Sequence, residues 1–219
     1  IRDGATVISK KGEFLFTYSP SIFFMECASK PVVYENKTFK RVQPLSHEED
    51  FEFPPPVGKM KVYYVSHEEP FTLPRFIGKE VKFVDFKMAI PRDLYQTVKA
   101  LLKIGMLRED PIEVNGVKVS PLAVLLSLLP PPITSANIEG FEMLVVQAKG
   151  EVKNEKYKLT GYVYLTHKNS LAKFGETATA FLTSICPAIV IDMFAKGEIK
   201  HTGVILPEML DCEKILQRL

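Results

Sequence analysis

The chain has 219 residues, of which 46% are hydrophobic and 25% are charged, a balance that excludes an intrinsically disordered protein. Its 28 lysine and arginine residues against 26 aspartate and glutamate residues give a net charge of +2. A charge this small argues against nucleic acid as a partner, because binding to phosphates needs a clustered cationic excess.

The cysteines and the apolar runs indicate the surroundings of the protein. Cys27, Cys186 and Cys212 are widely separated and form no zinc pattern, and their odd number argues against a disulfide framework. We therefore expect a reducing, cytoplasmic setting and no metal site. The longest apolar run, residues 122–129, is shorter than the roughly 20 residues that span a bilayer, so we expect no membrane partner.

The first block, residues 1–57, combines one helix with extended segments. The Ser-Pro-Ser sequence at 19–21 predicts a helix start, because serine caps helices and proline suits their first turn. Residues 37–42 mix charged and β-forming side chains, which predicts a half-buried strand. The predicted apolar face of the helix consists of Ile22, Phe23 and Met25.

The middle block, residues 58–132, alternates strands and helices. A helix opening at Pro91 and ending at Gly105 is predicted by apolar residues at helical spacing. The Asn115-Gly116 pair predicts a tight hairpin turn. The other predicted elements are strands at 59–65 and 80–88, a short helix at 73–77 capped near Thr72, and a helix at 122–129.

The last block, residues 133–219, begins with a long hairpin, for which two β-rich runs at 142–152 and 156–166 are the signal. A helix at 177–195 contains Cys186-Pro187, and we expect this proline to kink or restart it. Two short helices end the chain. Strands interleaved with helices and hairpins predict an α+β fold, with a mixed, largely antiparallel sheet and helices mainly on one face.

The motifs of common nucleotide-binding enzymes are missing. The 12 glycines include no GxGxxG or GxxxxGK[ST] pattern, so the chain lacks the usual phosphate-binding loops. The densest polar stretch, residues 66–75, follows a predicted strand and leads into a helix. There His67 could change its protonation, the adjacent acids could bind an amine, and Arg75 could hold a carboxylate. The simpler interpretation is a solvated surface loop with a capping pair of acids.

Other polar residues also have two interpretations. Lys87 in the predicted strand at 80–88 could bind a substrate carboxylate, or its stem could extend along the surface to place the ammonium in solvent. We interpret His167 as a turn residue and Thr179 as a small side chain that allows close packing. Cys186 is interpreted as a buried thiol, because the sequence places no base beside it.

Four stretches carry a family resemblance. They are residues 16–21 (FTYSPS), 67–75 (HEEPFTLPR), 84–87 (VDFK) followed by 101–107 (LLKIGML), and 178–208 with its Gly197, Gly203, Pro207 and Glu208. Together they resemble the C-terminal substrate and dimerisation domain of the saccharopine dehydrogenase family. The resemblance implies one domain over residues 1–219 and a Rossmann domain, expected before Ile1, that holds NAD or NADP.

The resemblance also implies a function. It points to an oxidoreductase that acts on an amino acid or on the imine formed from one, with this chain as the substrate-binding part and without a cofactor site of its own. It implies His67 as a catalytic proton relay and a homodimer across the other face of the sheet. The substrate-binding residues would be Glu69, Thr72, Arg75 and Lys87. The alternative is a stand-alone amino-acid-binding or regulatory module without catalysis.

Overall fold

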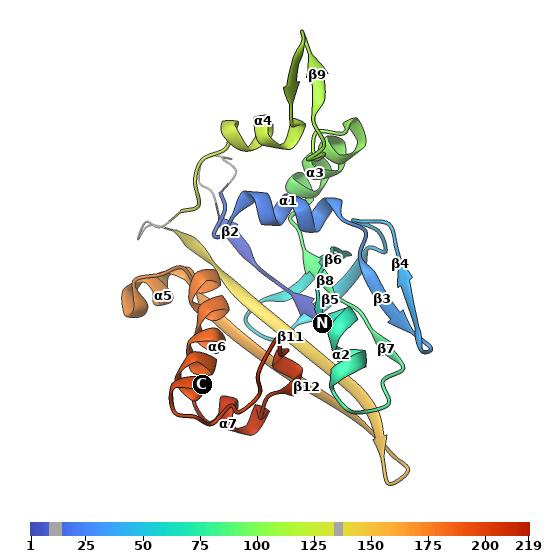
Figure 1. The fold of residues 1–219 in the computed structure, drawn as a ribbon, viewed down its shortest axis with the longest axis vertical. Helices are drawn as coiled ribbons and strands as arrows, with labels where there is room; N and C mark the ends of the chain where they lie inside the picture. Colours follow the sequence, from blue (N-terminus) through green and yellow to red (C-terminus); the bar gives the residue numbers. More distant parts are fainter. Residues whose placement is uncertain (9–14, 134–137) are drawn as a thin grey trace.

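The structure, a computed structural model, describes residues 1–8, 15–133 and 138–219, and a mixed sheet forms its centre (Figure 1). Neighbouring strands of this sheet run antiparallel, except that β1 and β8 are parallel. The predicted α+β fold with a largely antiparallel mixed sheet is confirmed. The strands lie in the order β12 (Glu155–Thr166), β11 (Glu139–Val152), β1 (Arg2–Asp3), β8 (Lys87–Ala89), β6 (Gly58–Tyr64) and β5 (Glu49–Phe53), and β2 (Thr6–Ile8) also pairs with β11.

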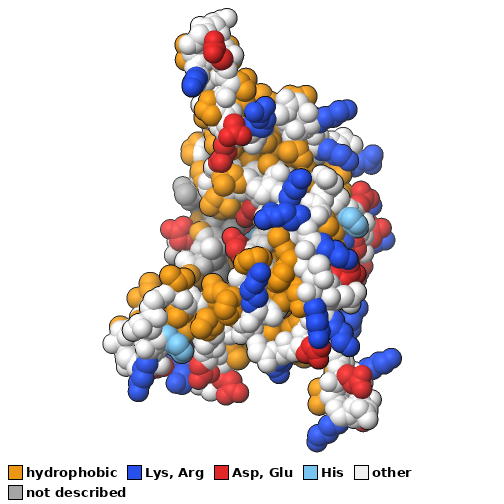
Figure 2. Space-filling view, turned by 45° about the vertical axis from the view of Figure 1, so that its right-hand side comes forward, with side chains coloured by type: hydrophobic (Ala, Val, Ile, Leu, Met, Phe, Trp, Pro, Cys, Tyr) orange, Lys and Arg blue, Asp and Glu red, His pale blue; other side chains and the backbone are white. Residues whose placement is uncertain are grey.

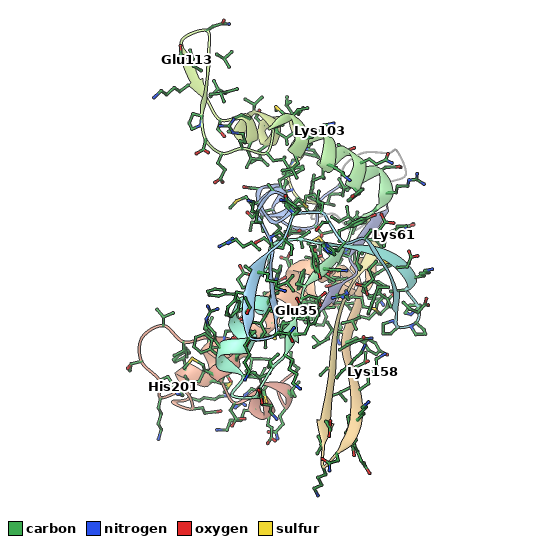
Figure 3. All side chains as sticks on the ribbon, turned by 90° about the vertical axis from the view of Figure 1, so that its right-hand side faces the viewer. Glu35, Lys61, Lys103, Glu113, Lys158 and His201 are labelled. Carbon is green, nitrogen blue, oxygen red and sulfur yellow. The ribbon has the colours of Figure 1, made fainter. Side chains whose placement is uncertain are left out.

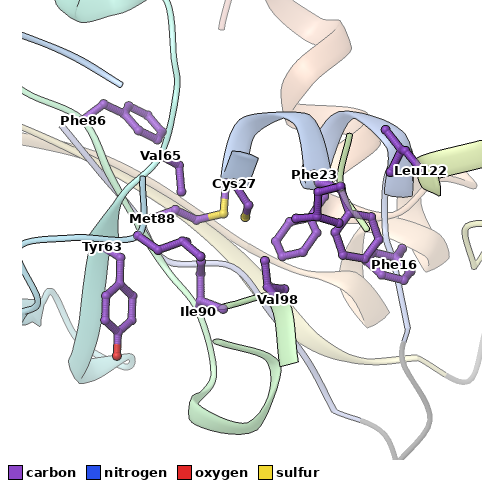
Figure 4. Packing of buried hydrophobic residues seen from close by; sticks show 13 residues of the cluster. Phe16, Phe23, Cys27, Tyr63, Val65, Phe86, Met88, Ile90, Val98 and Leu122 are labelled. Atoms are coloured by element: carbon purple, nitrogen blue, oxygen red, sulfur yellow. The ribbon is translucent and has the colours of Figure 1, made fainter. Parts of the chain in front are cut away.

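Side-chain alternation divides the central strands into two faces. One face carries Tyr63 of β6 and Met88 of β8, and helices pack onto it (Figure 4). The other face carries Val62 and Ala89, which pack with side chains of β5 and β11. The helices therefore cover mainly one face of the sheet. Because side chains alternate along a strand, neighbouring residues of β1 or β8 point to opposite faces, and only every second one lies under the helices. The covering helices are α1 (Pro20–Ala28), α3 (Arg92–Ile104) and α4 (Pro121–Leu128).

Helix α1 begins where the sequence predicts, but it buries a different face. Its buried residues are Phe23, Phe24 and Cys27, whereas Ile22 and Met25 are exposed. The buried set follows the spacing of one helical face, i, i+1 and i+4, so the predicted face was wrong by about one residue. Phe24 and Cys27 were the buried residues that the prediction omitted.

The segment after β6 also differs from the prediction. Helix α2 (Glu69–Phe76) begins at Glu69 rather than near Thr72, because Pro70 already occupies its first turn. The predicted strand at 80–88 is broken into β7 (Phe83–Val84) and β8, which belong to different sheets.

A small sheet flanks α2. It consists of β4 (Thr38–Arg41), β3 (Val32–Glu35) and β7, in that order. All residues of β4 are exposed, so the predicted half-burial of this strand was wrong. Phe39 of β4 nevertheless contacts Phe71 of α2, with 5.5 Å between the ring centroids. The small sheet thereby supports the outer side of α2.

Both predicted hairpins are confirmed. β9 (Ile112–Val114) and β10 (Val117–Val119) turn at Asn115-Gly116, where φ is 51° and 80°. An Asn-Gly pair favours these left-handed values, which is why it predicts a two-residue turn. β11 and β12 form the long hairpin, and it turns at Lys153-Asn154, again with positive φ. Figure 3 shows the two hairpins projecting from the body, marked by Glu113 and Lys158.

The C-terminal part contains α5 (His167–Phe174), α6 (Ala178–Ala195), the short 3₁₀ helix η1 (Pro207–Met209) and α7 (Cys212–Leu216). Helix α5 was not predicted. Helix α6 continues through Pro187 without interruption, so the expected restart at this proline was wrong. Cys186 is exposed, so its interpretation as a buried thiol was wrong. Among the described helices, α6 is long and apolar enough to cross a membrane by length and composition, unlike the shorter run at 122–129.

The contact between β2 and β11 generates the first testable prediction. Gly140 at the start of β11 has φ of 129°, and a Cβ atom there would overlap the carbonyl oxygen of Thr6. We expect Gly140→Ala to lower the free energy of unfolding by about 2 kcal/mol or more, measured by urea denaturation. Gly161→Ala on β12 is the control, since nothing lies within 4 Å of a Cβ atom there. Equal stability of the two variants would contradict this packing.

Candidate functional site

His67 lies between β6 and α2, on the helix-covered face of the sheet. Its ring stacks on Phe86, with 4.0 Å between the ring centroids and 5° between the ring planes. Its Nδ1 is hydrogen-bonded to the carboxylate of Glu69, the first residue of α2. The stacking on Phe86 and the bond to Glu69 therefore fix the imidazole in one orientation. The structure thus brings together His67 and Glu69, two of the predicted site residues.

Glu26 on α1 faces the other nitrogen of the same ring. Its Oε1 lies 4.0 Å from His67 Nε2, and its Oε2 accepts a hydrogen bond of 3.1 Å from the hydroxyl of Tyr18. Sequence reasoning missed both residues. One signal was present, because Glu26 is the only charged residue in the otherwise apolar segment PSIFFMECA of α1.

The carboxylates set the electrostatics of His67. Burial opposes the charged imidazole, but the hydrogen bond to Glu69 and the charges of Glu69 and Glu26 raise its pKa above the usual value. Burial favours the neutral acid at Glu69, yet the hydrogen bond and the charge of His67 lower the pKa of this carboxyl. Burial raises the pKa of Glu26 and, well above its usual value, that of Tyr18. The pair of His67 and Glu69 therefore favours its ionised form.

Two further acids lie on this face. Asp3 is in register with Leu144 and Met88, and Glu142 is two residues from Leu144, so both belong to the helix-covered side. Burial raises the pKa of both carboxyl groups, and the charge of Glu142 raises that of Asp3 further. Glu142 also accepts a hydrogen bond of 2.6 Å from the hydroxyl of Thr179 at the start of α6. Thr179 thus serves as a donor, which corrects its interpretation as mere close packing.

Lys87 lies on the opposite face of the sheet. It alternates with Met88 on β8, and the residue is only 6% exposed, so the interpretation that its ammonium extends to solvent was wrong. The ammonium donates hydrogen bonds of 2.8 Å to Glu49 and 2.9 Å to the carbonyl of His47. The structure does not bring Lys87 together with Glu69, and its role in substrate binding stays a prediction that these contacts do not support.

Arg2 completes the charge balance on this opposite face. It is in register with Lys87, and its guanidinium donates hydrogen bonds of 2.9 Å to Glu49 and 2.8 Å to Asp85. The side chains of Arg2 and Lys87 therefore bond two carboxylates here, and these bonds link β1 and β8 to β5.

Thr72 and Arg75 lie further along α2. The hydroxyl of Thr72 is hydrogen-bonded to the carboxylate of Glu208 in η1, so the C-terminal segment contacts this helix. The guanidinium of Arg75 lies 3.6 Å from the ring centroid of Phe71 and 4.0 Å from that of Phe39. Its Nη1 donates a hydrogen bond of 2.7 Å to the carbonyl of Phe71, and the remaining N–H groups of the exposed guanidinium are of the kind that binds a carboxylate. No hydrogen bond or ion pair among the described residues joins Arg75 to Glu69.

His167 was interpreted as a turn residue, and this was wrong. It is fully buried at the start of α5, where Nδ1 accepts a hydrogen bond of 3.2 Å from the backbone N–H of Ala178. Nε2 lies 3.2 Å from the carbonyl oxygen of Thr6. Burial lowers the pKa of His167, so it links α5, α6 and β2 as a neutral ring.

Three residues around His67 are of the types that bind metal ions. Atoms of His67, Glu68 and Glu69 that are able to ligate a metal lie within 4.8 Å of one another. However, His67 Nδ1 already bonds Glu69, and the side chain of Glu68 is 85% exposed. The arrangement is that of an ion pair at a helix start, where acids are favourable without a metal.

Comparison with known proteins places these residues in a family. Residues 4–219 match the family described as Saccharopine dehydrogenase C-terminal domain. The chain is 29% identical over 209 residues to a carboxyaminopropylagmatine dehydrogenase of Synechocystis sp., covering 94% of this chain and 52% of that protein. It is 27% identical over 208 residues to a carboxynorspermidine synthase of Vibrio alginolyticus, covering 94% of this chain and 49% of that protein. The chain thus spans about half the length of the curated relatives it matches.

The fold has a counterpart among solved structures. Apo saccharopine dehydrogenase (L-Glu forming) of Saccharomyces cerevisiae superposes with a TM-score of 0.64 at 15% identity, covering 99% of this chain and 62% of that one. An identity this low supports the fold alone. Because the family match extends over nearly all of the residues, the chain belongs to the saccharopine dehydrogenase family and carries its C-terminal domain.

Proposed function

We propose that this domain is the substrate-binding part of an NAD(P)-dependent oxidoreductase acting on an amine or imine that carries a carboxyl group. The observation that carries the proposal is the pair of His67 and Glu69, stacked on Phe86 beside the start of α2. The curated relatives support it, because their names describe a dehydrogenase and a synthase of carboxylated polyamines. The cytoplasmic setting remains a prediction.

His67 is suited to move the proton of such a reaction. Its Nδ1 is engaged by Glu69, so Nε2 is the nitrogen that can exchange a proton with the nitrogen of a substrate. The adjacent carboxylates favour the imidazolium, which can donate a proton to an amine leaving the site or accept one after losing its own. Glu69 then acts as the positioning residue, because it holds the ring and stabilises its charge.

Arg75 and Thr72 provide the other end of the proposed site. The guanidinium of Arg75 suits a carboxylate, and its contacts with two rings and with the carbonyl of Phe71 hold it in place. The hydroxyl of Thr72 is held by Glu208 near the same helix. Binding the carboxyl end of a substrate here would orient the reacting C–N bond toward His67.

The residues of this chain do not fit a dinucleotide. The described helices follow Ser19, Glu68, Pro91, Ser120, Thr166, Thr177 or Asp211 rather than a glycine-rich turn. Several of these caps already accept hydrogen bonds from their own helix, as Ser120 does from Ala123. The cofactor, which supplies the hydride chemistry, would be held by a dinucleotide-binding unit outside this chain.

A homodimer is part of the proposal, but through a strand edge, whereas the resemblance implied the other face of the sheet. β12 pairs only with β11 among the described strands, so its outer edge is free along twelve residues. Leu159, Tyr162 and Val163 are exposed on this strand, Leu159 by 72%. Exposed edges with apolar side chains favour pairing with another strand, and a second copy of the same hairpin offers a matching edge.

The activity is tested with the full-length protein. We expect reduction of NAD or NADP with carboxynorspermidine, carboxyaminopropylagmatine or saccharopine, followed by nicotinamide absorbance. His67→Asn should lower kcat about 100-fold, because a proton-transferring side chain contributes at least that much. Arg75→Ala should instead raise KM. His201→Asn, which changes an exposed histidine, is the control. Binding of these amines without turnover would favour the non-catalytic module.

The protonation of His67 is tested by NMR titration of its ring. The midpoint should lie above the ordinary value of about 6.5 in the unaltered protein. Glu69→Gln keeps the burial but removes the anion, so we expect the midpoint to fall by about one pH unit. Glu52→Gln on the exposed side of β5 is the control, since this carboxylate is not among the charges that act on His67. A midpoint that does not respond to Glu69→Gln would remove Glu69 as the positioning residue.

The dimer is tested by light scattering of the full-length protein. We expect a dimer, and we expect Leu159→Glu to shift it toward monomer, because a buried charge at the strand edge is unfavourable. Val117→Glu introduces the same charge at an exposed valine of the β9–β10 hairpin and should leave the mass unchanged. A monomer at all concentrations would refute the interface.

A further inference from the structure

The backbone of Glu26 is bonded to the segment that carries His67. Helix α1 ends at Ala28, and the last carbonyl groups of a helix lack partners within it. The carbonyl of Glu26 accepts a hydrogen bond of 2.9 Å from the backbone N–H of Ser66, the residue before His67. The fold therefore holds the end of α1 against the imidazole, independently of the side chains between them.

The side chain of Glu26 lies in a more enclosed place than a surface charge. Figure 2 shows basic and acidic side chains interspersed over one face of the molecule, where water and salt screen them. The side chain of Glu26 is only 17% exposed and that of His67 is 26% exposed. Charges act on each other more strongly at such covered positions. Glu26 therefore acts on the ring although its Oε1 lies 4.0 Å from Nε2, beyond hydrogen-bond distance.

Tyr18 determines which oxygen of Glu26 faces the ring. It precedes Ser19, the residue that caps α1, and its ring packs edge-on against Phe23 with 6.4 Å between the centroids. Its hydroxyl donates a hydrogen bond of 3.1 Å to Oε2 of Glu26. With Oε2 engaged in this way, Oε1 is the oxygen that points to Nε2 of the imidazole.

We propose that Glu26 and Tyr18 are positioning residues for the proton-transferring nitrogen of His67, an inference that rests on the proposed function. Glu69 holds Nδ1 from the start of α2, and Glu26 faces Nε2 from α1, so the ring lies between two carboxylates. The N–H of the imidazolium at Nε2 then points toward an anion. Transfer of this proton to a substrate nitrogen leaves a neutral ring that still donates its Nδ1 proton to Glu69.

The charges around the ring predict the direction of each effect. Burial raises the pKa of Glu26, whereas the charge of His67 and the hydrogen bond from Tyr18 lower it. Tyr18 thus favours the ionised carboxylate, which in turn favours the imidazolium. Removal of either residue should lower the pKa of His67. The acids that act on the ring or on Tyr18 are Glu26 of α1, Glu68 and Glu69 at the start of α2, and Asp3 of β1.

The test is NMR titration of the His67 ring in the full-length protein. Glu26→Gln should lower the midpoint by about 0.5 pH unit or more, because it removes the anion that faces Nε2. Tyr18→Phe should lower the midpoint by less, since the anion remains. The double variant should match Glu26→Gln alone, because Tyr18 acts only through Glu26. Tyr157→Phe is the control, since its hydroxyl donates the same kind of bond to Glu155 on the exposed β11–β12 hairpin.

A kinetic measurement separates positioning from mere support of the fold. Glu26→Gln should lower kcat about tenfold with little change in KM, because a misplaced proton-transferring group slows the reaction more than it weakens binding. The pH midpoint of kcat should move in the same direction as the midpoint of the ring. Glu26→Asp, which keeps the charge, should recover part of the lost kcat.

Each outcome supports or overturns the proposal. Thermal unfolding checks that the variants fold, and Tyr18→Phe, which removes a single oxygen atom, is the test if Glu26→Gln does not fold. An unchanged midpoint in the folded variants, or shifts that add in the double variant, would overturn the proposal. Shifts of the midpoint as expected in a protein without oxidoreductase activity would refute the proposed reaction but leave the positioning of His67 intact, so the two failures are distinguishable.

Discussion

The two halves of the central sheet are joined by its shortest strand. β1 consists of Arg2 and Asp3, and it alone connects the β11–β12 side of the described sheet with the strands β8, β6 and β5. Because side chains alternate along a strand, these two residues point to opposite faces. Arg2 enters the balanced network with Glu49 and Asp85, and Asp3 meets Glu142 below the helices. Two consecutive residues therefore belong to two different surroundings: Arg2 to the face where cations pair with carboxylates, and Asp3 to the face where acids are in excess.

This separation explains why the candidate site lies on the helix-covered side. Cations on the opposite face are bonded to carboxylates and are mostly buried, so they are not free to bind a ligand. Below the helices, the single imidazole of His67 is surrounded by Glu26 and Glu69. An excess of buried acid lowers the stability of a domain, and folds retain such an arrangement where it serves binding or proton transfer.

Local patterns in the sequence predicted much of the fold. The Asn-Gly turn, the long hairpin, and the helices that open at Pro20 and Pro121 are set by capping and turn chemistry, and they are where the sequence predicts them. Helix α5 and the early start of α2 were missed, because few apolar residues at helical spacing mark them. The error at α2 arose from weighing Pro74 above Pro70 as the first-turn proline.

The candidate site was predicted only in part. His67 and Glu69 are two residues apart, so one motif contained both. Glu26, Asp3 and Glu142 reach the same place through the packing of distant strands and helices, which no local pattern records. The location of Lys87 was misjudged for a similar reason, since its partners Glu49 and Arg2 come from other strands. The pairing of the strands, more than the type of each residue, determines which charged side chains contact one another.

The bond between Thr72 and Glu208 has a consequence for the order in which the molecule forms. These residues are 136 positions apart, and through them η1 holds the helix that begins with Glu69. During synthesis on the ribosome, α2 emerges long before this part of the chain exists. The hydrogen bond to α2 can form only after residues 207–209 have left the exit tunnel, so the contact that holds this helix forms later than the helix itself.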